Sequence, residues 1–193
     1  MKIIERLTNS RFAIVWLKLY SYLSLRLNKK EKKNHWPAVN KPSSLEQLGR
    51  LMLEYNDLWH ADKYLDIISI PEKLQAAMDG DIIITNNCDC DEFARYCCEA
   101  LTKFNADYID MIQMQSAVYF VDKTIKGHFV CSFRSNGLMY YIGNWGLFKT
   151  NVNRQPMHSQ LDIANDIAAR ANGTLITSWT VGHKTLSDWN KVT

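Results

Sequence analysis

The sequence lacks several features that would restrict its class at once. Its five cysteines are an odd number and four of them cluster, so a framework of paired disulfides is not indicated. It has no apolar run of the ~20 residues that span a membrane, because Lys18 interrupts the longest candidate, residues 12–27. Internal repeats and low-complexity blocks are also absent. These absences favour a globular protein of a reducing compartment over a disulfide-rich or membrane-spanning one.

The composition is that of a globular domain with an unevenly distributed charge. Of the 193 residues, 47% are hydrophobic and 22% are charged, which is enough to bury a core. The net charge is +3, but residues 1–41 carry ten Lys/Arg and two acidic residues, so this arm has a charge of +8 and the remainder −5. A basic arm predicts an anionic partner, either a membrane surface or nucleic acid; the alternative is a solvated tail.

The basic arm contains an expected amphipathic helix. Apolar residues recur at helical spacing between Phe12 and Leu27, and the helix either packs on the body or lies on a membrane. Residues 29–43 are polar with two prolines and are typical of a linker. We therefore expect an arm and linker over 1–42 and a domain over 43–193. Glu5 and the lack of a small-residue cleavage site argue against a secretory signal, so we expect a cytoplasmic protein or one peripheral to a membrane.

The remaining pattern predicts helices followed by strands. Helices are expected from Ser43 or Ser44 to Tyr55, from Pro71 to a stop at Gly80, over 91–104 and over 159–171. Strands are expected over 81–85, 107–114, 117–122, 127–133, 138–145 and 174–181. This order is typical of an α+β domain with an antiparallel sheet.

Residues 86–101, NNCDCDEFARYCCEAL, hold four of the cysteines at the start of an expected helix. Cys90 and Cys97 would lie ~10 Å apart along this helix, too far to share one zinc ion. A zinc site of Cys88, Cys90, His128 and Cys131 stays open as an alternative. Cys97 and Cys98 fall among the apolar positions and are interpreted as core residues.

Cys90 can instead be a nucleophile. A thiol in the first turn of a helix lies at the positive end of the helix dipole, which favours the thiolate. Asp91 and Glu92 oppose that effect, so a neighbouring imidazolium would be needed to hold the charge. Backbone N–H groups at the helix start could bind the oxyanion of a tetrahedral intermediate.

The segment D-C-D-E-F-A at 89–94 resembles the D-C-[DE]-D-[FY]-A signature of the bacterial transglutaminase-like cysteine proteinases, a branch of the papain-like and transglutaminase superfamily. The stretch from Tyr64 to Asp81, G-H-F-V-C-S-F and Y-Y-I-G-N-W are similar to further segments of that family, and the likeness covers residues 45–181. It implies a papain-like or transglutaminase-like core, with the nucleophile at the N-terminus of a central helix packed on an antiparallel sheet. An insertion, IIITNNC, separates Asp81 from Asp89.

The resemblance implies three catalytic residues. Cys90 would be the nucleophile and His128 the base and later the acid. The family's Leu-Asp-Asn corresponds to Ile-Gly-Asn here, so the acid falls on Gly143, and Asn144 becomes the candidate that orients the imidazole. A hairpin centred near Asn136 would place His128 opposite Asn144.

The implied activity is thiol-dependent acyl transfer on a protein or peptide substrate. It would be peptide hydrolysis or glutamine deamidation or transamidation, and it requires no cofactor. Some members of the family bind calcium through acids that flank the cysteine, which here are Asp89, Asp91 and Glu92; the competing interpretation is that these acids cap the helix. The alternative to an enzyme is a catalytically inactive fold that acts as a structural or peptide-binding module.

Overall fold

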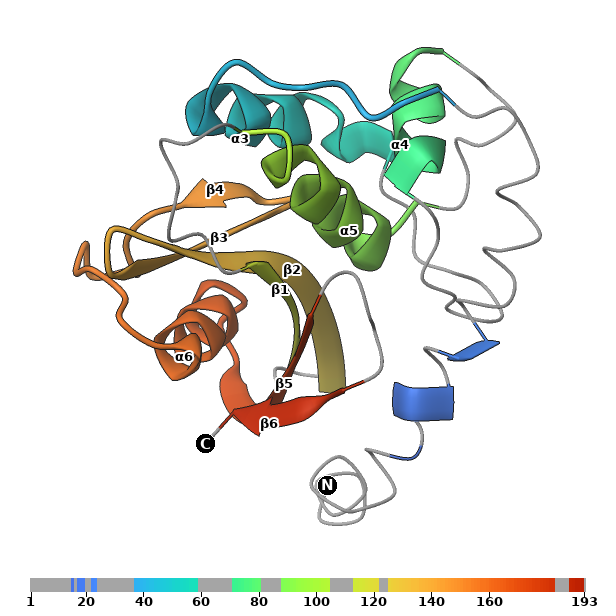
Figure 1. Cartoon of the computed structure of the whole chain (residues 1–193). Helices are drawn as coiled ribbons and strands as arrows, with labels where there is room; N and C mark the ends of the chain where they lie inside the picture. The colour runs from blue at the N-terminus through green and yellow to red at the C-terminus, as the bar shows by residue number, and fades with distance from the viewer. Residues whose placement is uncertain are drawn as a thin grey trace.

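A computed structural model describes residues 15, 17–19, 22–23, 37–58, 71–80, 88–104, 113–121, 125–182 and 188–192 (Figure 1). The expected strand over 81–85 lies outside these residues. Within them, the chain is an α+β structure in which helices pack on an antiparallel sheet. No helix among the described residues is long and apolar enough to cross a bilayer.

The sheet has six strands in the order β4-β3-β2-β1-β5-β6, and all neighbours are antiparallel. The strands are β1 (Gln113–Val121), β2 (Ile125–Ser135), β3 (Leu138–Gly143), β4 (Gly146–Phe148), β5 (Thr174–Gly182) and β6 (Asn190–Val192). The central β2 pairs with β1 through Val118↔His128 and with β3 through Cys131↔Ile142.

The helices lie on both faces of the sheet (Figure 1). One side carries α3 (Leu45–Glu54), the 3-10 turn η1 (Asn56–Leu58), α4 (Pro71–Met78) and α5 (Cys90–Leu101), and the other carries α6 (Gln160–Arg170). The starts that the sequence predicts at Ser44 and Pro71 are confirmed, because Ser44 caps α3 and Pro71 opens α4. Helix α5 begins at Cys90, one residue before the expected range, and ends at Leu101 instead of Phe104.

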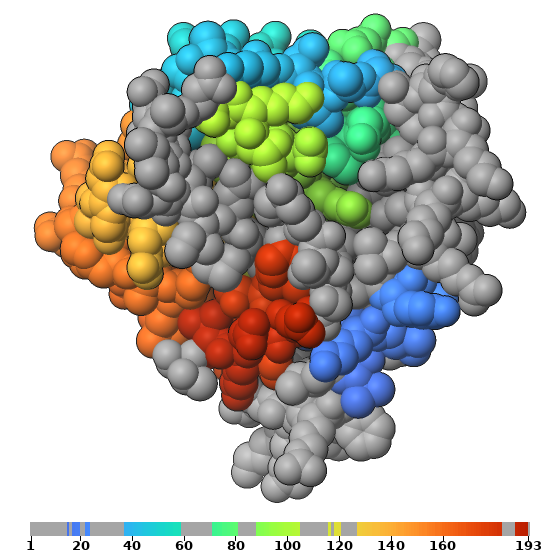
Figure 2. Space-filling model, viewed as in Figure 1, coloured from blue at the N-terminus to red at the C-terminus, as the bar shows by residue number. Residues whose placement is uncertain are grey.

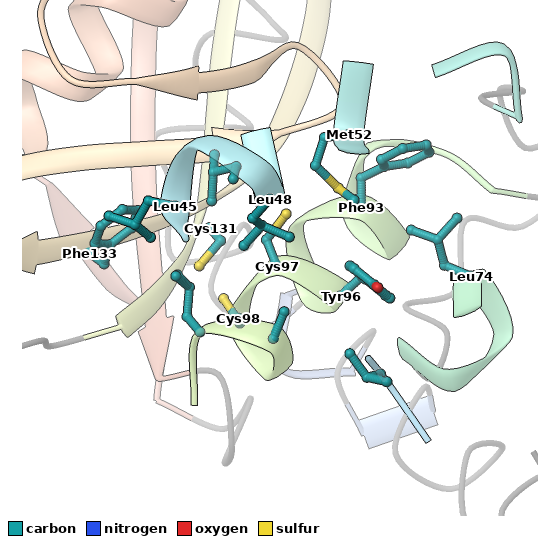
Figure 3. Packing of buried hydrophobic residues seen from close by; sticks show 14 of the residues in the cluster. Leu45, Leu48, Met52, Leu74, Phe93, Tyr96, Cys97, Cys98, Cys131 and Phe133 are labelled. Carbon is teal, nitrogen blue, oxygen red and sulfur yellow. The ribbon is translucent and has the colours of Figure 1, made fainter. Parts of the chain in front are cut away.

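The α5 side of the sheet is filled by a core that includes four cysteines, among them Cys88 (Figure 3). Cys97 and Cys98 of α5 and Cys131 of β2 are each 0% exposed and pack with Leu48 and Phe133. The interpretation of Cys97 and Cys98 as core residues is therefore confirmed. Burial holds the pKa of the Cys97 and Cys131 thiols above the ordinary value, because the thiolate would lose its hydration.

The α6 side has a second core, which includes β1. Residues 107–112 of the expected strand over 107–114 lie outside the described ranges. Val118, Val130 and Tyr141 pack against Ile163 and Ile167 of α6. The sequence predicts an interruption near Ser116, but β1 runs through it without a break. The Ser116 hydroxyl is hydrogen-bonded to Ser132 Oγ at 2.7 Å, which satisfies a polar group inside the strand.

Candidate active site

Helix α5 starts with a capping box built from the acids on either side of Cys90. Asp89 is the N-cap, and its Oδ1 accepts a hydrogen bond from the Asp91 N–H at 3.1 Å. The Glu92 carboxylate in turn accepts a hydrogen bond from the Asp89 N–H at 2.9 Å. The interpretation of the flanking acids as helix caps is confirmed for Asp89 and Glu92. The box fixes the backbone immediately before and after the candidate nucleophile.

The Cys90 thiol lies in the first turn of α5 and is partly exposed, whereas the four other cysteines are buried. The backbone N–H of Phe129 in β2 donates a hydrogen bond to Cys90 Sγ at 3.4 Å. Cys90 also packs against a cluster formed by Phe129, Trp179 and Trp189. The sulfur is thus held between the first turn of α5 and the central strand.

The register between β2 and β3 differs from the prediction by one residue. Asn136 and Gly137 have φ values of 51° and 76° and form a two-residue turn between Ser135 and Leu138. The β2–β3 ladder ends at Cys131↔Ile142, and Asn144 and Trp145 form the turn between β3 and β4, so neither of them pairs with His128 across the strands. The imidazole does stack on the indole of Trp145, with ring centroids 3.9 Å apart and planes 17° apart. The expected pairing of His128 with Asn144 is wrong for this reason.

Strand alternation determines the face of the sheet that each side chain occupies. His128 pairs with Val118, and both Val118 and Val130 belong to the core on the α6 side. Phe129 lies on the α5 side with Cys90. Cys90 and His128 therefore reach the same stretch of β2 from opposite faces of the sheet.

His128 is buried in an apolar setting. It is 5% exposed, and its Nε2 has no hydrogen-bond partner within the part of the chain that the structure describes. Burial lowers the pKa of His128 from 6.5 to about 3, because the imidazolium would lose its hydration, while the Asp89 carboxylate opposes this effect. The imidazole is consequently neutral at physiological pH.

Asn144 lies in the turn between β3 and β4 and is 4% exposed. Its Nδ2 donates a hydrogen bond to Asn56 Oδ1 at 3.2 Å, which places the amide on the side of α3 and η1. Its Oδ1 is buried and has no hydrogen-bond partner among the described residues. A side chain at Gly143 would instead contact Val130, so the acid of the resembling family would occupy the face on which His128 lies.

Among the described residues, only one group of three or more potential metal-ligating side chains lies close enough together to hold an ion. Ligand atoms of Asp89, Asp91 and Glu92 all lie within 4.8 Å of one another. Carboxylate oxygens suit calcium, but one oxygen each of Asp89 and Glu92 is already engaged in the cap. The acids therefore fit a cation only through their other oxygens, and calcium stays a prediction. The alternative zinc site is wrong, because its four proposed ligands form no such group.

Two residues of this region were not found by sequence reasoning. Phe129 holds the Cys90 sulfur through its backbone, and the alternation of β2 offers no signal for that contact. Trp145 could have been found, because an Asn-Gly pair typically occupies both central positions of a two-residue hairpin turn. A turn centred on that pair assigns position 145, and not 144, to the face of the sheet on which His128 lies.

No protein-family model matches the chain, and no curated protein matches its sequence.

Proposed function

We propose that this protein is a thiol-dependent acyl-transfer enzyme with a papain-like or transglutaminase-like core, in which Cys90 is the nucleophile. The observation that carries the proposal is the position of the Cys90 thiol. It is partly exposed at the start of α5, and it accepts a hydrogen bond from the backbone N–H that directly follows His128. The α5 helix on an antiparallel sheet, and the chain order Cys90, His128, Asn144, agree with the resembling family.

The proposed reaction acts on an amide carbonyl, in a peptide bond or in a glutamine side chain. The Cys90 sulfur bonds to the carbonyl carbon while its proton passes to His128, and the oxyanion forms near the N-terminus of α5. The C–N bond then breaks, the departing amine takes the proton from His128, and a thioester remains on Cys90. Attack by water makes the reaction a hydrolysis or deamidation, and attack by a lysine amine makes it a transamidation.

Two unsatisfied atoms support the role of His128 and Asn144. A neutral imidazole is the form that accepts a proton, and its Nε2 can donate a hydrogen bond to a carbonyl oxygen such as Asn144 Oδ1. Both atoms are buried without a partner among the described residues, which is costly. A hydrogen bond between them would satisfy both atoms. Because His128 lies on the opposite face of β2 from Cys90, the reactive arrangement requires the backbone at the start of β2 to rotate, and not the side chain alone.

A second candidate function is a non-catalytic structural or peptide-binding module. The stack of His128 on Trp145 favours it, since it holds an uncharged imidazole on the α6 side of the sheet. Gly143, which stands where the resembling family has an acid, also favours it. In that case Cys90 would be an ordinary thiol at the start of a capped helix.

An assay with an activated ester distinguishes the enzyme from the non-catalytic module without knowledge of the natural substrate. With the 4-nitrophenyl ester of N-benzyloxycarbonylglycine at pH 7, an enzyme gives a burst of one nitrophenolate per chain and then turns over. Cys90→Ala abolishes both phases, and His128→Gln slows acylation by ~10²–10⁴-fold, the usual contribution of a general base. His158→Gln, at an exposed histidine, is the matched control and retains the wild-type rate. A wild-type rate no higher than that of N-acetylcysteine would refute the enzymatic proposal.

A further inference from the structure

The basic arm has one described stretch that packs on the body. Residues 15, 17–19 and 22–23 are helical, and Leu17 is only 4% exposed. Leu17 belongs to the cluster that contains Trp179 of β5 and Trp189. In Figure 2 the described arm residues, in blue, lie at the surface beside the C-terminal residues, in red. Leu17 therefore anchors this helical stretch to the body.

The opposite side of the same stretch exposes a stripe of apolar side chains. Val15, Leu19, Tyr22 and Leu23 are 62%, 47%, 58% and 41% exposed. At 100° per residue they fall within an arc of about 100°, and Leu17 points away from the middle of that arc. They are four of the seven large hydrophobic residues that are exposed among the described residues. Such a concentration of exposed apolar side chains on one helix face indicates a binding surface for another molecule or for a membrane.

The charge of the arm indicates what the stripe docks on. Residues 1–41 have a charge of +8, and Lys18 is exposed at the border of the stripe. The body of the protein has a net charge of −5, so the net positive charge is confined to the arm. Anionic membranes attract such segments, by about fivefold in affinity for each Lys or Arg near the surface. The ring of Tyr22 suits the headgroup level, where one end of a side chain is apolar and the other hydrated.

We propose that the face formed by Val15, Leu19, Tyr22 and Leu23 docks on an anionic lipid surface. The helix lies in the plane of the interface, with these side chains among the headgroups and acyl chains and Lys18 directed to the phosphates. Leu17 keeps the helix attached to the body, so the whole protein is held at the surface. Cys90 packs against the same cluster that receives Leu17, so the arm attaches beside the candidate nucleophile. The docking itself does not depend on any chemistry at Cys90.

Flotation of the full-length chain with vesicles tests this proposal. We expect binding to phosphatidylcholine vesicles that contain 30% phosphatidylserine, much weaker binding to phosphatidylcholine alone, and weakening as salt is raised. The variant Val15→Ser/Leu19→Ser/Tyr22→Ser is expected to lose at least ~10-fold in affinity, because it removes the apolar contact. Lys18→Gln alone is expected to lose about fivefold.

The matched control replaces apolar residues that are exposed elsewhere. Leu53→Ser/Val152→Ser/Leu161→Ser changes side chains that are 57%, 46% and 36% exposed, and it should bind vesicles as wild type does. All substituted residues are exposed, so thermal melts should show that the variants fold. Equal binding by wild type and the arm variant would overturn the proposal. So would a wild-type dimer that the arm variant dissociates, or binding of a DNA duplex but of no vesicle.

Discussion

Acidification should destabilise the protein through His128. Its pKa is about 3 in the folded chain, against an ordinary value of 6.5, because burial disfavours the imidazolium. A histidine whose pKa is lowered by folding contributes stability that is complete above pH 6.5 and is lost as the pH falls toward 3. Between pH 7 and pH 5 the unfolded chain takes up about 0.7 of a proton at this residue and the folded chain almost none. The resulting loss in unfolding free energy is roughly 2 kcal/mol.

The assay compares wild type with His128→Phe in urea unfolding at pH 7 and pH 5. Phenylalanine retains an aromatic ring for the stack on Trp145 but cannot titrate, so the contributions of the other ionisable groups cancel in the difference. Wild type should lose about 2 kcal/mol more than the variant, or about 4–8 °C in Tm. His158→Phe, at an exposed histidine, reports the effect of losing any histidine.

Two other outcomes would each refute the reasoning about His128. Equal losses in wild type and His128→Phe would mean that the imidazole is hydrated in solution. A smaller loss in wild type would mean that the folded pKa lies above 6.5. That reversal requires a charged imidazole in the folded protein, as in a pre-formed ion pair with the Cys90 thiolate.

Two substitutions test the packing around the site. Asp89→Ala removes the N-cap of α5 and should cost about 1 kcal/mol, or 2–4 °C in Tm by calorimetry; an unchanged Tm would contradict the capping box. If calcium raises the Tm of wild type but not of Asp89→Ala, the acids also bind a cation. Gly49→Ala places a Cβ 2.7 Å from Leu147 Cβ and should destabilise the chain by ~1–3 kcal/mol in urea, since it overpacks α3 against β4. Adding Leu147→Ala should recover part of that loss, and a Gly49→Ala variant as stable as wild type would refute the close contact.

Local chemistry explains which elements could be predicted from the sequence. A hydroxyl before an apolar helical repeat places the start of α3 at Ser44, and Pro71 places the start of α4. The capping box of α5 is equally local, because Asp89 and Glu92 are three residues apart. The short β6 and the continuous β1 were missed, because they depend on partners far away in the chain. Ser116 in β1, for example, is satisfied by Ser132.

The arrangement of the site could be predicted only in part. The position of Cys90 follows from the helix pattern, but the face on which His128 lies depends on strand alternation and register together. A shift of one residue in register moves each side chain to the other face of the sheet relative to its partner strand. The prediction centred the hairpin turn on Asn136, whereas the observed turn is centred between Asn136 and Gly137. Burial of His128 could not be predicted either, since it depends on Trp145 and on the core against α6.

The most direct test of acyl transfer is to locate the acyl group itself. The protein is mixed with the benzyloxycarbonylglycine ester at pH 7, quenched in acid within the burst, digested and mapped by mass spectrometry. A single acyl group on Cys90, released by hydroxylamine and formed far more slowly in His128→Gln, is the expected result. An acyl group spread over lysines and other thiols, or one formed on Cys90 at the same rate without His128, would contradict catalysis by this site.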